Sequence, residues 1–211
     1  VLHCQQEVQA LSKRSGDWLV TTEDREFACG TLVNAAGSWA GELGRLAGLD
    51  DLGITPKRRT ALSLRLPAQR FDADWPLVVD IDGEFYFKPD AGLLLLSPAD
   101  ETPSAACDVQ PEEWDIAVAM DRFQRASTLR ISRIEHKWAG LRSFAADREF
   151  VVGFDPRDEG FFWLAGQGGY GVQTAPGLAK LSASLLLDAA DRRPVQMAPY
   201  LELLAPERLM Q

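Results

Sequence analysis

The chain has 211 residues, of which 46% are hydrophobic and 25% are charged, and its formal net charge at pH 7 is −9. These proportions are ordinary for a globular protein and exclude a disordered or fibrous chain. The acidic balance argues against nucleic acid as a partner, because the densest basic run, Lys57-Arg58-Arg59, is only three residues long. The three cysteines have neither the number nor the spacing of a disulfide framework or a metal site. We therefore expect no metal, and a cytoplasmic location with peripheral attachment to the inner membrane as the alternative.

The first fifty residues predict a β-meander followed by a buried strand and a helix. Three short strands of the meander are expected before residue 15, at 18–22 and at 26–29. A strand over residues 31–37 ends in small side chains and leads into a helix from Trp39 to Ala47. The chain starts without an initiator methionine, directly in strand-like alternation. We therefore expect it to be the C-terminal part of a longer polypeptide.

Residues 51–137 predict a separate, sheet-rich domain. Strands are expected at residues 60–66, 77–81, 84–88, 93–97 and 134–142. Pro111 and the acids after it predict a helix start, and Ile116, Met120 and Phe123 form its apolar stripe. The flanking segments 1–50 and 138–211 are expected to belong together in a second domain.

A glycine-rich segment, Gly166-Gln167-Gly168-Gly169-Tyr170-Gly171, follows predicted strands at 150–152 and 161–165. It precedes a helix that we expect Thr174 and Pro176 to open. The segment matches the G-x-G-x-x-G pattern of dinucleotide-binding proteins. The chain breaks near residues 188–194 with no second strand, so the βαβ unit that this pattern requires is missing. Such a loop, aimed at a helix N-terminus, still suits a delocalised negative charge like that of a reduced flavin. The alternative is a loop that uses glycine only to turn tightly.

Three motifs stand in one order along the chain: VNAAGSWA at 33–40, WAGLRSF at 138–144 and the glycine loop. This order resembles the C-terminal half of the FAD-dependent D-amino acid oxidase and glycine oxidase family, and bacterial D-arginine dehydrogenases in particular. Segments 56–59, 74–76, 85–92 and 160–163 are also similar to that group. The resemblance implies an α/β (α+β) fold. It would be the C-terminal part of a two-domain flavoprotein, with an antiparallel or mixed substrate-domain sheet and part of the FAD domain.

The resemblance also implies a set of site residues, none of them a catalytic side chain. Substrate-binding positions are Arg59, Tyr86 and Arg142 for the carboxylate, and the carbonyl of Gly169 for the amine. Residues near FAD are Ala36, Gly37, Trp39, Gly168, Gly169, Tyr170, Gly171, Val172 and Gln173. The residue types suit the task, because a planar guanidinium binds a carboxylate through two hydrogen bonds and a tyrosine hydroxyl adds another. The alternatives are solvated surface charges for the arginines and core packing for Tyr86.

The implied function is FAD-dependent oxidation of D-amino acids, with D-arginine or another cationic or apolar side chain. Hydride transfer to flavin N5 would yield an imino acid that hydrolyses to a 2-oxo acid and ammonia. The electron acceptor stays unidentified. One alternative is a glycine or sarcosine oxidase that uses O₂. Others are a carboxylate-binding module without redox chemistry, and a non-catalytic fragment or subunit. The family's nucleotide-binding fingerprint is absent from this chain, so we expect a missing N-terminal nucleotide-binding half as its partner.

Overall fold

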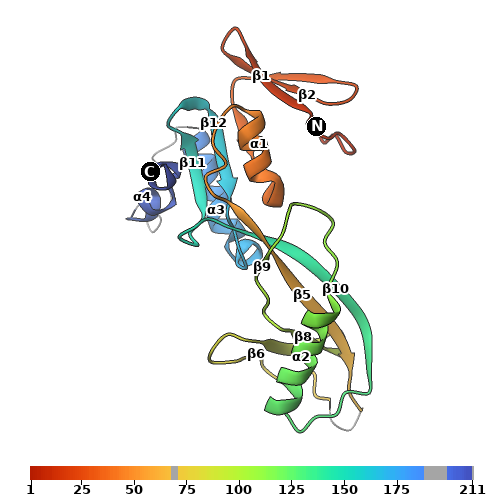
Figure 1. Cartoon of the computed structure of the whole chain (residues 1–211). Helices are drawn as coiled ribbons and strands as arrows, with labels where there is room; N and C mark the ends of the chain where they lie inside the picture. Colours follow the sequence, from red (N-terminus) through yellow and green to blue (C-terminus); the bar gives the residue numbers. More distant parts are fainter. Residues whose placement is uncertain (68–70, 188–198, 211) are drawn as a thin grey trace. The chain divides into compact units, whose positions relative to one another are not determined.

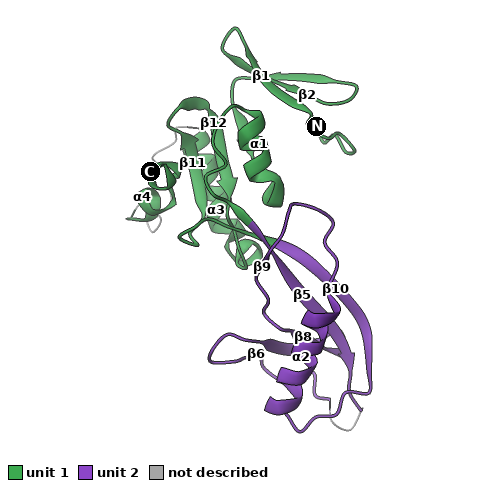
Figure 2. Cartoon of the chain, in the orientation of Figure 1, with its two compact units in different colours: residues 1–55, 142–211 green, residues 56–141 purple. Residues whose placement is uncertain are grey.

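The computed structural model describes residues 1–67, 71–187 and 199–210, so the predicted chain break at 188–194 lies outside the described residues. The chain forms two compact units (Figure 2). Unit 1 comprises Val1–Thr55 and Arg142–Gln211, and unit 2 comprises Pro56–Leu141. The sequence placed the domain boundaries at residues 50 and 137. The units divide slightly later because two long strands, β5 (Thr55–Arg65) and β10 (Arg133–Phe144), each cross from one unit into the other.

Unit 1 contains two sheets and the helices that cover one of them. Its elements are β1 (Ala10–Arg14), β2 (Asp17–Thr21), β3 (Glu26–Cys29), β4 (Leu32–Asn34), η1 (Gly37–Trp39), α1 (Ala40–Leu46), β11 (Val151–Asp155), β12 (Asp158–Ala165), α3 (Gly171–Leu186), α4 (Leu201–Leu204) and η5 (Pro206–Leu209). The first three strands form the predicted antiparallel meander, in the order β1-β2-β3. The other sheet has the order β11-β12-β4, with β12 antiparallel to β11 and parallel to β4.

Strand β12 is buried on both faces, which explains its uninterrupted apolar sequence. Phe161 and Trp163 point into a core with Trp18 of the meander, whereas Phe162 points into a second core with Leu181 of α3. All three aromatic side chains on β12 have no exposed surface. A strand covered on both faces has no polar alternation to show in its sequence. This strand therefore anchors the layers of unit 1.

Unit 2 is an antiparallel sheet with one long helix on one face (Figure 1). Besides β5 and β10 its elements are β6 (Val78–Val79), β7 (Tyr86–Asp90), β8 (Leu93–Ser97), β9 (Thr102–Pro103) and α2 (Glu113–Ala126). The strand order is β10-β5-β8-β7-β6, and β9 also pairs with β5. Ile116 and Phe123 of α2 pack against Leu62 of β5 in the unit 2 core. The apolar stripe predicted from the sequence thus covers the sheet.

The structure confirms the predicted fold class, with antiparallel and mixed sheets joined by helices. One boundary differs clearly from the prediction: α3 begins at Gly171, so Pro176 lies inside the helix. The missing N–H of Pro176 leaves the carbonyl of Val172 without its helical partner, and Val172 is 95% exposed, so water can bond to it. Among the described residues, no helix combines the length and the apolar character needed to span a membrane.

One buried carboxylate joins the turn of the β11–β12 hairpin in unit 1 to the body of β12. Asp155 has no exposed surface and accepts hydrogen bonds from Arg157 Nε at 2.9 Å and Arg157 Nη2 at 2.8 Å. Trp163 Nε1 donates a third, at 3.0 Å. Burial acts to raise the pKa of Asp155, but the hydrogen bonds from Arg157 and Trp163 outweigh it and hold this pKa below its ordinary value. The ionised carboxylate therefore stabilises unit 1.

We expect Asp155→Asn to lower the free energy of unfolding of unit 1 by about 2 kcal/mol at pH 7, because one arm of the Arg157 fork loses its acceptor. The folded-state pKa lies below the unfolded value of about 3.9, so the contribution is complete above roughly pH 5 and is lost as the pH falls through the folded-state pKa. Urea titrations followed by tryptophan fluorescence measure the difference at pH 7 and pH 3.5. Glu159→Gln, at an exposed position on β12 in the same hairpin, is the matched control. A difference that persists undiminished at low pH contradicts the assignment.

Candidate functional site

The turn after β4 is held by one buried amide. Asn34 has no exposed surface; its Nδ2 donates to the carbonyl of Ala40 at 2.8 Å and its Oδ1 accepts from Ala36 N at 3.3 Å. Both bonds fix the short turn that carries three predicted cofactor neighbours, namely Ala36, Gly37 and Trp39. Gly37 has φ +59°, and Trp39 is 43% exposed. The turn lies at the carboxyl end of a parallel strand, which is where open α/β sheets bind their ligands.

The glycine loop lies at the same edge of the same sheet. It follows the carboxyl end of β12, which runs parallel to β4. Gly166 has φ +74° and Gly168 has φ +52°, so the backbone turns sharply before α3 begins at Gly171. The structure thus brings together the two segments that the resemblance assigned to FAD: residues 36–39 and residues 168–173.

The end of β10 contacts both segments. The carbonyl of Ser143 accepts a hydrogen bond from Gly168 N at 2.9 Å, and Ser143 Oγ lies 3.4 Å from Ser38 Oγ. Arg142 and Phe144 share the opposite side of the strand from Ser143. A Cβ atom on Gly169 would lie 2.8 Å from Arg142 Nη1, and one on Gly168 would lie 2.6 Å from the ring of Phe144. Glycine at both positions permits this approach without a shift of the Arg142 or Phe144 side chain.

Among these residues, Ser38, Ser143 and Phe144 were not predicted as site residues. Two of them touch a predicted residue, because Ser143 bonds the backbone of Gly168 and Phe144 packs on the same glycine; Ser38 in turn contacts Ser143. The available signal was the alternation of Arg142 and Phe144 on one strand face, with a small polar residue between them. What the sequence did not show was that this strand ends against the loop.

The residues of unit 1 fit FAD. No side chain caps α3, and its first turn contains no acid, so its N-terminal N–H groups are left for a ligand. Tyr170 is 59% exposed and Val172 is 95% exposed, while Gly171 and Gln173 add no charge at this end of the helix. A helix N-terminus carries a partial positive charge that favours an anion or a reduced ring. The backbone of Gly168 to Gln173 and the turn around Gly37 would therefore hold the cofactor.

In unit 2, Arg59 and Tyr86 lie on the same face of the sheet, opposite α2. Leu62 of β5 and Phe87 of β7 point into the core beneath α2, and side chains alternate along each strand. Arg59 and Tyr86, each an odd number of residues away, therefore point to the other face. Tyr86 pairs across the strands with Ser97. The residues beside Tyr86 belong to the core: Phe85 is buried, and its ring stacks near that of Phe87 at 6.4 Å.

The basic run of β5 is neutralised by acids of unit 2. Arg59 Nη2 lies 3.1 Å from Glu101 Oε1, and Lys57 Nζ lies 3.2 Å from Glu101 Oε2. Arg58, which is 7% exposed, pairs with Asp115 at 2.9 Å and also with Glu112. The Arg59 side chain is only 12% exposed, so it is not a solvated surface charge. Its guanidinium is held in place within unit 2.

A glycine loop between a mixed sheet and an open helix N-terminus is a feature of proteins that bind nucleotide cofactors, flavoproteins among them. The sequence pattern of the FAD dependent oxidoreductase (DAO) family matches residues 1–185, and the chain belongs to this family. The cofactor of the family is FAD.

One sequence relative and two solved structures show what the chain is similar to. The chain is 26% identical over 199 residues to the FAD-dependent oxidoreductase domain-containing protein 1 of Mus musculus, covering 85% of the chain and 40% of that protein. The solved L-proline dehydrogenase of P. horikoshii shares the fold, with a TM-score of 0.78, 21% identity, and coverage of 97% of this chain and 54% of that one. The glycine oxidase of Geobacillus kaustophilus has a TM-score of 0.71 and 25% identity, with coverage of 92% and 51%. The chain therefore spans about half the length of these solved proteins, and less of the mouse relative.

We expect Gly168→Ala to destabilise unit 1 by about 2 kcal/mol, because the new methyl group meets the Phe144 ring and the backbone keeps a positive φ. Gly177→Ala is the matched control. Gly177 lies in the middle of α3, and a Cβ there meets nothing within 4 Å. It should raise stability by about 0.5–1 kcal/mol through helix propensity. Urea denaturation of both variants measures the contrast, and equal effects would show that the loop is not packed as described.

Proposed function

We propose that the chain is the substrate-binding and flavin-contacting part of an enzyme that oxidises D-amino acids with FAD. The observation that supports this most is the contact between Arg142 and the glycine loop. A guanidinium packed directly on Gly169 places a carboxylate-binding group beside backbone groups that suit a flavin ring. A small amino acid whose carboxylate binds Arg142 would thus have its Cα–H close to the proposed flavin position.

The residues of unit 1 have two tasks in this proposal. Arg142 binds and orients the substrate carboxylate, and the carbonyl of Gly169 accepts a hydrogen bond from the substrate amine. When bound, FAD would supply a hydride acceptor for the substrate Cα, and loss of hydride from the neutral-amine form of the substrate would give the protonated imino acid. The imino acid that results is hydrolysed by water to a 2-oxo acid and ammonia, and no side chain of this chain needs to act as a nucleophile. The protein contributes orientation and electrostatics.

In unit 2, Arg59 and Tyr86 are proposed to bind a substrate carboxylate, as the resemblance implies. Both point to the sheet face opposite α2, and hydrogen bonds to the Asp100 carbonyl and the Glu101 carboxylate fix the geometry of the Arg59 guanidinium. The side-chain preference of the enzyme is proposed to be cationic or apolar, as the resemblance to bacterial D-arginine dehydrogenases implies.

A glycine or sarcosine oxidase that reduces O₂ is the second candidate. Its support is the 25% identity to a glycine oxidase over 92% of this chain. Production of hydrogen peroxide during turnover distinguishes this candidate from a dehydrogenase, which passes electrons to another acceptor.

The proposal includes a nucleotide-binding half that this chain does not contain. Strand β4 is an edge of the β11-β12-β4 sheet within the described residues, and Val33 on it is 39% exposed. Parallel strands are normally covered on both faces and paired on both sides. A further parallel strand of the nucleotide-binding half is the partner that would complete this edge.

The visible absorption spectrum of the purified chain, before and after addition of FAD and gel filtration, is the first test. A retained flavin band that bleaches under anaerobic conditions with a D-amino acid supports the proposal. Retained flavin that bleaches with glycine or sarcosine and not with any D-amino acid overturns it in favour of the second candidate. If the chain retains no flavin, the same panel is applied after co-expression with a nucleotide-binding half.

We expect Arg142→Met in the FAD-loaded enzyme to lower kcat/KM by a factor equivalent to about 2–4 kcal/mol, because it removes the charged anchor while keeping an unbranched apolar stem. Arg130→Met, an exposed position of unit 2, loses the same charge and should change kcat/KM little. Steady-state kinetics on both variants check this. A kcat/KM within about threefold of wild type for Arg142→Met would remove Arg142 from the site.

A further inference from the structure

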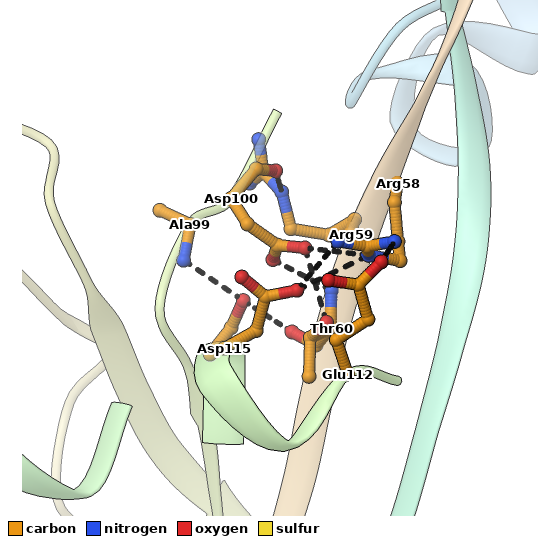
Figure 3. A network of polar contacts seen from close by, with 8 residues as sticks. Arg58, Arg59, Thr60, Ala99, Asp100, Glu112 and Asp115 are labelled. Carbon is orange, nitrogen blue, oxygen red and sulfur yellow. Dashed lines mark hydrogen bonds and ion pairs between the residues drawn. The ribbon is translucent and has the colours of Figure 1, made fainter. Parts of the chain in front are cut away.

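The loop after β8, residues 97–101, is bonded tightly to the middle of β5. Ser97 Oγ donates to the carbonyl of Thr60 at 2.6 Å and accepts from Ala99 N at 3.2 Å. The Asp100 carboxylate accepts from Thr60 N at 2.7 Å and from Thr60 Oγ1 at 3.0 Å (Figure 3). Ala99 has φ +54°, a strained value for a residue with a side chain. The loop therefore takes this path because its bonds to Thr60 outweigh the strain.

A buried ion cluster around Arg58 links the same loop to the start of α2. Arg58 Nε donates to Asp115 Oδ2 at 3.1 Å and lies 3.8 Å from Asp100 Oδ2. Arg58 also pairs with Glu112, just before the first turn of α2 (Figure 3). Burial and the neighbouring charge of Asp100 raise the pKa of Asp115 above its ordinary value, although Arg58 acts to lower it. Asp100 and Arg58 have only 8% of their side-chain surface exposed, so solvent screens this cluster weakly.

Asp100 also touches the arginine that the proposed function places on the substrate. Its backbone carbonyl accepts a hydrogen bond from Arg59 Nε at 2.8 Å. The same residue thus holds β5 through its carboxylate and the Arg59 guanidinium through its carbonyl. A long, flexible side chain loses rotamer freedom when it binds a ligand, and this loss is smaller if the side chain is already fixed.

We propose that Asp100 is a positioning residue that fixes the guanidinium of Arg59 for binding a substrate carboxylate. The hydrogen bonds from Asp100 to Thr60 set the path of residues 97–101, and this path places the Asp100 carbonyl at Arg59 Nε. The carboxylate role of Arg59 rests on the proposed function, whereas the fixing of its side chain does not. The two parts can therefore be tested separately.

The first experiment reads the Arg59 Nε–H resonance in ¹⁵N-labelled 211-residue chain, with Arg59→Lys to assign it. In Asp100→Ala the resonance should move to the position of exposed arginines, and its exchange with water should speed up at least about tenfold. Asp100→Asn keeps an acceptor for Thr60 N and should retain the wild-type signal. Glu113→Gln, a carboxylate of α2 that pairs with Lys137, is the control.

An unchanged Arg59 signal in a folded Asp100→Ala chain overturns the proposal. If Asp100→Ala does not fold, Thr60→Val serves instead, because it removes only the bond at Oγ1. That variant should shift the signal part of the way, and an unshifted signal overturns the proposal equally.

The second experiment uses the FAD-loaded enzyme and the amino acid that bleaches it. Asp100→Ala should raise KM about tenfold with kcat changed less than about twofold, and Asp100→Asn should restore KM. A raised KM in Arg59→Ala together with an unchanged KM in Asp100→Ala overturns the positioning role. An unchanged KM in Arg59→Ala instead contradicts the proposed role of Arg59 at the substrate, and the resonance experiment alone then decides whether Asp100 positions it.

Discussion

Gly168 and Gly169 let the end of β10 approach the loop before α3 so closely that a Cβ atom at either position would displace Phe144 or Arg142. The carbonyl of Ser143 anchors the loop at this point, and the Arg148 guanidinium lies 4.5 Å from the centre of the Phe144 ring. Phe144 is thus confined between Gly168 and a cation. Because the loop leads directly into α3, the position of the helix N-terminus depends on this close approach. The cofactor-binding edge of unit 1 is therefore set mainly by backbone geometry.

Unit 2 presents its functional groups by a different means. The arginines of β5 are held by acids from two other segments, the loop at residues 97–101 and the start of α2. Such pairs add little net stability, since each buried charge must first lose its water. These pairs instead fix geometry, because Asp100 and Asp115 hold the Arg58 guanidinium in the arrangement in which it is paired with both carboxylates. Arg59 is the next residue on the same strand, so fixing Arg58 also helps to fix the backbone position of Arg59.

The sequence predicted most of the fold because its elements carry local signals. The apolar stripe of α2, the alternation around Tyr86 and the continuous run Phe161-Phe162-Trp163 each depend only on neighbours in the chain. The exceptions have no such signal. Strand β9 is only two residues long and forms by pairing with β5. Helix α3 begins at Gly171, five residues before Pro176, directly after the turn of the glycine loop. Both are tertiary effects that override local preference.

In the candidate site, too, some residues can be recognised from the sequence and others only from tertiary contacts. Chemical type marks Arg59 and Arg142 as anion-binding groups, and glycine spacing marks the loop, so these residues stand out in the sequence. Their partners do not, because Asp100 is 41 residues from Arg59 and could have been any of the many acids of the chain. What distinguishes Asp100 is that the β5–β8 pairing, with Leu62 opposite Leu96, brings the end of β8 beside Thr60. The strand register, which depends on burying the leucines beneath α2, therefore also determines which acid reaches the arginine.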